Sequence, residues 1–136
     1  MEPLDPILCG LPHREPFIFI DAVLALEPGQ SALCSKHFAA SEPYFLGHFP
    51  GNPLVPGVLL TEAAAQTAGI AAGAPGKVYH LSAIRQMKFL RPVPPGSIVE
   101  FTASKTASIG DLLQFQVTAR VTSELVAEGT IILNAL

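Results

Sequence analysis

Residues 47–73 read GHFPGNPLVPGVLLTEAAAQTAGIAAG, and this stretch decides the fold. Three prolines at a spacing of three follow His48. They stiffen the backbone, because proline fixes its own φ and favours an extended residue before it. The segment after the last of these prolines is rich in helix formers and carries a single charged residue, Glu62. Because a helix that is apolar almost all round is normally buried, the stretch predicts an ordered loop leading into a buried helix, roughly Val58 to Ala72.

Strand patterns lie on both sides of this helix. Before it, Phe17–Leu26 is a nearly continuous apolar run with β-branched and aromatic members, and Ser31–Phe38 follows a Pro-Gly turn as the return strand of a hairpin. After the helix, further strands are expected at Val78–Phe89, Ile98–Ala107, Leu112–Thr122 and Leu125–Leu133.

The order of these elements predicts one α+β domain over residues 1–136. About six antiparallel strands would wrap around one long central helix, whose many alanines allow close approach. Charged residues make up only 14% of the chain, against about a quarter in typical domains. We therefore expect apolar surface to be covered by a second copy of the chain.

The net charge of −3 hides an uneven distribution of charge. No acidic residue occurs between Ala63 and Val99, whereas four of the eight basic residues do. These are Lys77, Arg85, Lys88 and Arg91. Such an unopposed stretch indicates either an acidic partner or a solvated basic rim.

Several classes of function find no support in the sequence. The acidic, proline-rich start MEPLDPIL does not resemble a signal peptide, and the apolar run is too short for a membrane span, so a cytoplasmic protein without membrane insertion is expected. Cys9 and Cys34 show no redox or metal spacing, and the four histidines show no metal-ligand spacing. No face typical of nucleic-acid binding is present.

The residues that could carry chemistry are His48 and Glu62. A histidine can accept a proton near neutral pH, and a carboxyl in apolar surroundings can hold one and act as an acid. The amide of Gly57, at the helix start, could stabilise an oxygen that becomes negative, and Gln66 lies one turn beyond Glu62. Together these groups suit removal of a carbon-bound proton and loss of a hydroxyl. Against this, a single loop histidine is more often structural, and a lone helical glutamate is usually exposed.

The sequence contains three longer motifs, LPHREPF (11–17), GHFPG (47–51) and PGVLLTEAAAQ (56–66), and the shorter segments KF, RPV, PG and LVAE between residues 88 and 128. Together these motifs resemble those of the bacterial (3R)-hydroxyacyl-acyl carrier protein dehydratases. The resemblance runs from about residue 8 to the end, and the second and third segments are the most specific.

The resemblance implies a hotdog fold and a homodimer or a trimer of dimers with sites at the interface. It implies that His48 of one chain takes the C2 proton while Glu62 of the other helps the 3-hydroxyl leave, with no cofactor and no metal. Gly57 would hold the thioester oxygen, Gln66 would position Glu62, and Phe49 would line the acyl tunnel. Lys88 and Arg91 would meet the acidic carrier protein. A hotdog thioesterase and a non-catalytic acyl-binding subunit are the alternatives.

Overall fold

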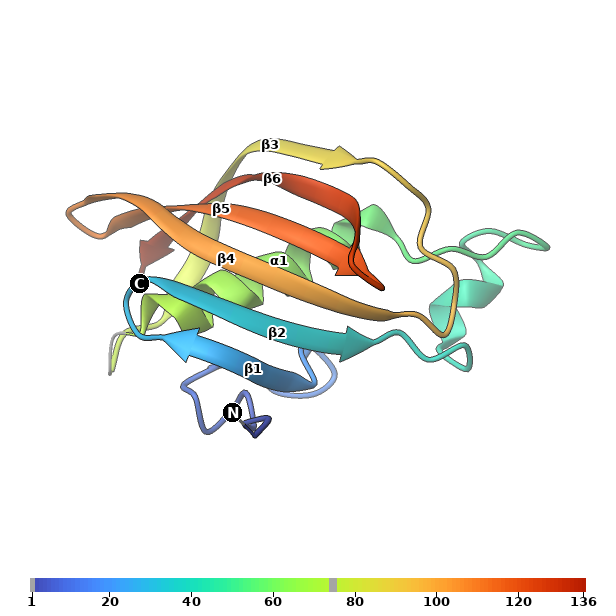
Figure 1. The fold of residues 1–136 in the computed structure, drawn as a ribbon, viewed down its shortest axis with the longest axis horizontal. Helices are drawn as coiled ribbons and strands as arrows, with labels where there is room; N and C mark the ends of the chain where they lie inside the picture. The colour runs from blue at the N-terminus through green and yellow to red at the C-terminus, as the bar shows by residue number, and fades with distance from the viewer. Residues whose placement is uncertain (1, 74–75) are drawn as a thin grey trace.

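The computed structural model describes residues 2–73 and 76–136, and shows a six-stranded antiparallel sheet curved around one long helix (Figure 1). The order of strands in the sheet is β1-β2-β4-β5-β6-β3. In chain order the elements are β1 (Ala22–Glu27), β2 (Ser31–His37), the 3-10 helix η1 (Pro43–Leu46), α1 (Gly57–Ala72), β3 (Tyr79–Phe89), β4 (Ile98–Ile109), β5 (Leu112–Val121) and β6 (Glu124–Ala135). The predicted α+β architecture is confirmed.

The helix α1 begins and ends close to where the sequence predicts. Pro56 precedes it, and the chain leaves it at Gly73, which adopts the left-handed conformation. Most of its side chains are buried beneath β2, β4 and β5. Within residues 2–73 and 76–136, no helix combines the length and apolar character that crossing a bilayer would need.

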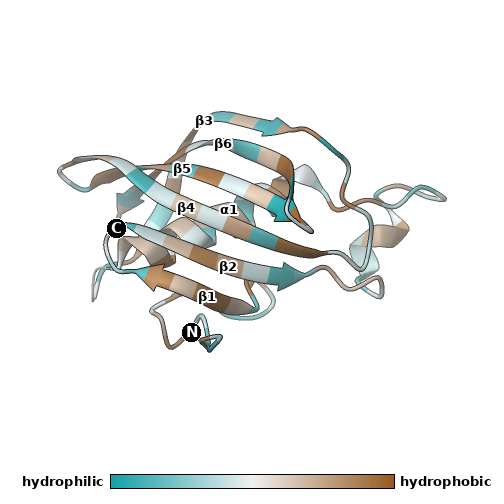
Figure 2. Cartoon of the chain, viewed as in Figure 1, coloured by the Kyte–Doolittle hydropathy of each residue, from teal (hydrophilic) through white to brown (hydrophobic). Residues whose placement is uncertain are grey.

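Buried and exposed residues alternate along the central strands β4 and β5, which pack against the helix. Polar and apolar residues alternate along β4 and β5 in Figure 2. On β5, Leu113, Phe115, Val117 and Ala119 are buried, while their neighbours lie on the outer face. This two-residue period gives the sheet one apolar face, and that face packs against α1.

A strip of α1 is left uncovered by the sheet. Val58 is 76% exposed, and Glu62 and Gly69 are partly exposed on the same side, four and eleven residues further on. These spacings place the three residues on one face of the helix. The helix is therefore buried on most sides but open along the line that carries its carboxyl group.

The strand predicted over Phe17–Leu26 is wrong in its first part, because β1 begins only at Ala22. The backbone of residues 17–19 is bound by a helix side chain instead of a neighbouring strand. Gln66 accepts a hydrogen bond from the Phe19 amide at 2.9 Å and donates one to the Phe17 carbonyl at 3.0 Å. The apolar side chains at the start of this run are explained by the packing of residues 17–19 against α1, not by a strand. The other predicted strands are confirmed, with ends that differ by a residue or two.

The pairing of β3 with β6 depends on a glycine. A Cβ placed on Gly129 would lie 2.2 Å from the Gln86 carbonyl oxygen and 2.7 Å from the Met87 sulfur, beside an irregularity in the β3 register. We predict that Gly129→Ala lowers the free energy of unfolding by about 1–3 kcal/mol, since the backbone must shift to admit the methyl group.

The control is Ser104→Ala, at an exposed position of β4. It should change the free energy of unfolding by less than about 0.5 kcal/mol, because surface substitutions away from special contacts are usually close to neutral. Urea unfolding of both variants checks this, and equal midpoints would contradict the close packing of Gly129.

Candidate active site

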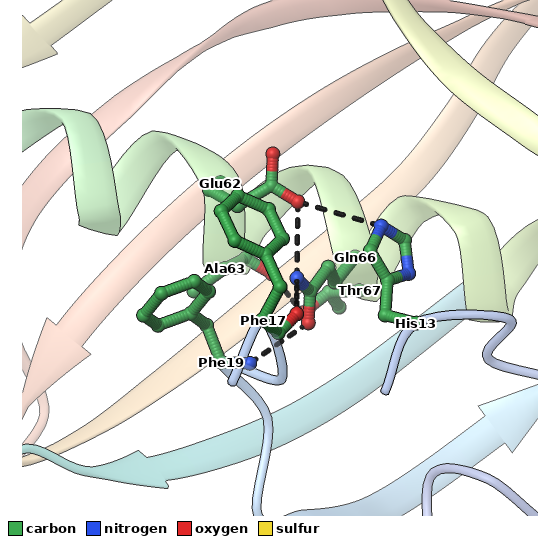
Figure 3. A network of polar contacts seen from close by, with 7 residues as sticks. All are labelled: His13, Phe17, Phe19, Glu62, Ala63, Gln66 and Thr67. Atoms are coloured by element: carbon green, nitrogen blue, oxygen red, sulfur yellow. Dashed lines mark hydrogen bonds and ion pairs between the residues drawn. The ribbon is translucent and has the colours of Figure 1, made fainter. Parts of the chain in front are cut away.

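Glu62 lies at the centre of a polar network between α1 and the N-terminal segment (Figure 3). Its Oε2 accepts a hydrogen bond from Gln66 Nε2 at 3.0 Å. The same oxygen lies 3.6 Å from His13 Nε2. The Glu62 side chain is 21% exposed, so it is less buried than the sequence suggested. The carboxyl group is held from one side and reaches solvent-accessible space on the other.

Gln66 is almost fully buried, at 1% exposure, and uses both ends of its amide. Besides Glu62, it binds the backbone of Phe17 and Phe19. A buried amide with these partners fixes the N-terminal segment against the helix and fixes the Glu62 carboxyl at the same time. The predicted contact between Gln66 and Glu62 is present.

A cavity of about 380 Å³ opens beside Glu62. Its lining is mostly apolar and comes from the N-terminal segment, α1, β3 and the end of β6. Residues on this lining include Phe17, Ala65, Leu81 and Leu133. A carboxyl group at an apolar cavity can meet an acyl chain and a hydroxyl group in the same place.

His48 lines a second cavity, of about 370 Å³, at the start of the helix. Its Nδ1 lies 3.1 Å from the Leu54 carbonyl oxygen, and its ring stacks on Phe49, with ring centroids 4.1 Å apart. Because a carbonyl oxygen can only accept, Nδ1 carries the hydrogen in this contact. The lone pair is then on Nε2, which makes that atom the proton acceptor.

The helix start lies in this second cavity, with Gly57 and Phe89 on its lining. Pro56 has no side-chain cap, and among the described residues no acceptor lies within hydrogen-bond distance of the Gly57 amide. A Cβ on Gly57 would lie 3.0 Å from the Phe89 ring. The glycine therefore allows the aromatic ring to pack against the helix start, a role that the sequence did not reveal.

Within one copy of the chain, His48 and Glu62 line different cavities. Gly57 and Phe49 lie with His48, whereas Gln66 lies with Glu62. The predicted site residues thus form two half-sites rather than one complete site.

The basic stretch is not unopposed in space, so that premise of the sequence analysis is wrong. Arg91 pairs with Glu124 at 2.7 Å, and Lys77 pairs with Asp111 at 3.3 Å. Glu124 is the first residue of β6, the strand that pairs with β3, and Asp111 lies in the turn between β4 and β5, so both acids reach the basic stretch through the fold of the sheet. Lys88 is exposed, and its cross-strand neighbour is Glu128.

Other chemistry finds little support in the described residues. Within the two described ranges, 2–73 and 76–136, no group of three or more His, Cys, Asp or Glu side chains could hold a metal ion. Cys34 is buried, and desolvation raises the pKa of its thiol to about 12. Because the thiolate is the nucleophilic form, Cys34 is a packing residue.

His13 is the residue in the Glu62 half-site to which the sequence analysis gave no role. It stands inside the LPHREPF segment, which was quoted only for its resemblance. Its neighbour Glu62 is far away in the chain, so sequence spacing could not bring the two together. The only sequence signal was the motif itself.

Known proteins are similar to this chain over most of its length. A family model described as ApeI-like, ApeI dehydratase, matches residues 25–130. The chain is 40% identical over 132 residues to the 3-hydroxyacyl-[acyl-carrier-protein] dehydratase FabZ of Sinorhizobium fredii, covering 94% of this chain and 86% of that protein. It is 42% identical over 135 residues to the dehydratase of the same name from Klebsiella pneumoniae, covering 93% and 88%.

Solved structures share the fold at low sequence identity. The dehydratase heterocomplex ApeI:P from Xenorhabdus doucetiae superposes with a TM-score of 0.80 at 14% identity, covering 98% of this chain and 91% of that chain. The uncharacterized protein PH1136 from Pyrococcus horikoshii gives 0.70 at 19%, covering 100% and 95%. The architecture and these structural neighbours define a hotdog-fold protein. The chain belongs to the 3-hydroxyacyl-[acyl-carrier-protein] dehydratase family.

The network around Gln66 makes a prediction about stability. Gln66→Leu should lower the free energy of unfolding by about 2–5 kcal/mol, because it leaves the Phe17 carbonyl and the Phe19 amide without their partner. The control is Thr67→Val on the same helical turn, where the hydroxyl donates to the Ala63 carbonyl of its own helix and otherwise meets the Cys34 thiol. Its cost should stay below about 1 kcal/mol. Thermal and urea unfolding of the two variants would show equal losses if Gln66 did not tie the segment down.

Proposed function

We propose that the protein dehydrates (3R)-3-hydroxyacyl groups on acyl carrier protein to trans-2-enoyl groups. Relatives named for this activity are 40–42% identical to the chain over most of its length. The observation that carries the proposal is the hydrogen bond of His48 Nδ1 to the Leu54 carbonyl, which leaves Nε2 free as a base in an apolar cavity. The Glu62 carboxyl supplies an acid in the complementary half-site.

The proposed reaction is an elimination in which each group has one task. His48 Nε2 removes the proton from C2 of the thioester, and the electron pair of that C–H bond forms the C2–C3 double bond. The C3–O bond breaks as Glu62 gives its proton to the 3-hydroxyl, which leaves as water. The Gly57 amide, at the positive end of α1, stabilises the negative charge that develops on the thioester oxygen.

The two halves of this chemistry require a second copy of the chain. A C2 pair of chains would place the uncovered strip of α1 against the same strip of its partner and bring His48 of one copy to Glu62 of the other. The strip itself supports this, because Val58 is 76% exposed beside Glu62. Strand β3 supports it too, as an edge strand on which Ile84 and Phe89 are about half exposed. An unpaired edge with apolar side chains is a ready template for pairing.

The carrier would approach from the His48 side. Arg91 lines the His48 cavity, and the exposed Lys88 lies on the adjoining end of β3. An acidic carrier could replace Glu124 as the partner of Arg91, because an exposed ion pair costs little to exchange. Phe49 would contact the acyl chain at the mouth of the cavity. Assembly into a trimer of dimers, a cytoplasmic location and independence of cofactors remain predictions.

Two substitutions test the assignment of the acid and the base. His48→Ala and Glu62→Gln should each lower kcat by about two orders of magnitude or more, as expected when a general base or acid is lost. The exposed residues His37 and Glu100 give the matched controls His37→Gln and Glu100→Gln, which should keep full activity.

The assay uses a 3-hydroxyacyl thioester and follows enoyl absorbance and free thiol together. Enoyl product without thiol supports a dehydratase. Thiol release without enoyl product would contradict it and point to a thioesterase. Unchanged turnover in either variant would remove that residue from the mechanism.

A further inference from the structure

His13 is fixed beside the carboxyl group in a way that its packing alone does not explain. Its Nε2 faces Glu62 Oε2 at 3.6 Å, and its ring stacks on Phe17 with an interplanar angle of 22°. Its Nδ1 is buried and has no hydrogen-bond partner among the described residues. A buried polar atom without a partner is unfavourable, so this ring position calls for a reason other than stability.

The backbone around His13 holds the ring in place. The Arg14 guanidinium donates to three successive carbonyls, those of Leu11, Pro12 and His13, at 2.9, 3.2 and 2.7 Å. Gln66 binds the same segment from the helix through the Phe17 carbonyl. The loop is thus tied at both ends, and the backbone that carries the imidazole is held beside Glu62.

Two nitrogen atoms therefore converge on one oxygen of the carboxyl group. Gln66 Nε2 and His13 Nε2 both face Oε2, while the other oxygen points away from both residues (Figure 3). The His13 tautomer with its hydrogen on Nε2 presents a donor to this oxygen. Because Oε2 already accepts a hydrogen bond from Gln66 and faces His13, it is a poor place for a proton, so the proton of the neutral acid belongs on Oε1.

We propose that His13 is a positioning residue for Glu62. Together with Gln66 it holds Oε2, so that Oε1 carries the proton and faces the cavity where the 3-hydroxyl would lie. This inference rests on the proposed function, because it gives Glu62 the role of the acid. The separation of 3.6 Å is longer than a hydrogen bond, and such contacts often shorten when the substrate binds.

The test compares two substitutions of similar size. His13→Leu removes the donor, whereas His13→Gln keeps an N–H group at about the reach of Nε2. We expect His13→Leu to lower kcat by about 10- to 100-fold with little change in KM, as for a misplaced catalytic group, and His13→Gln to keep most of the activity. The exposed histidine gives the control, His37→Leu, which should behave like the unmodified protein. Unfolding midpoints measured on all three variants separate a loss of fold from a loss of position.

A double-mutant cycle with Glu62→Gln distinguishes this inference from the proposed function. If His13 acts through Glu62, adding His13→Leu to Glu62→Gln should lower the residual activity by less than twofold, because the two effects share one cause. A full further loss in the double variant would overturn positioning and indicate direct contact with the substrate. A folded His13→Leu variant with the kcat of the unmodified protein would also overturn the positioning role of His13. The proposed function would still stand in that case if Glu62→Gln had lost its activity. Full activity in Glu62→Gln would instead remove the proposed function itself.

Discussion

Burying an almost uncharged helix is the constraint on which the rest of this structure depends. The alanines of α1 let β2, β4 and β5 approach closely, and the sheet curves to cover them. One sheet cannot enclose a helix completely, so a strip remains open, and the only charged residue of the helix lies on it. The hydrophobic effect therefore places Glu62 at the boundary between core and cavity, where a carboxyl group needs partners from the protein.

Those partners are supplied by the N-terminal segment rather than by the sheet. Gln66 links the backbone of residues 17–19 to the Glu62 carboxyl, so one buried amide fixes both the covering segment and the carboxyl group. At the other end of the site, the Leu54 carbonyl sets the hydrogen of His48 on Nδ1. A backbone group or an amide of the protein thus holds each of these two side chains, as the proposed acid–base chemistry would require.

The sequence predicted those parts of the molecule that depend on local periodicity. The helix and β5 were predicted within about a residue, because apolar spacing reports burial directly. Residues 17–21 were misassigned, since an apolar run packed against a helix looks like a buried strand. The basic stretch around Arg91 was judged unopposed, because its acidic partner Glu124 joins it only through strand pairing. His13 received no role for the same reason: its contact with Glu62 exists only in the folded chain.

The central claim is that the imidazole and the carboxyl group of one site come from two copies of the chain. Chains carrying His48→Ala can be co-expressed with chains carrying Glu62→Gln, each inactive by itself. In a shared site, random pairing makes about half of the dimers mixed, each with one intact site, so about a quarter of the activity should return. If mass spectrometry shows mixed dimers and the activity stays at the level of the separate variants, each site is built within one chain, and the claim is wrong.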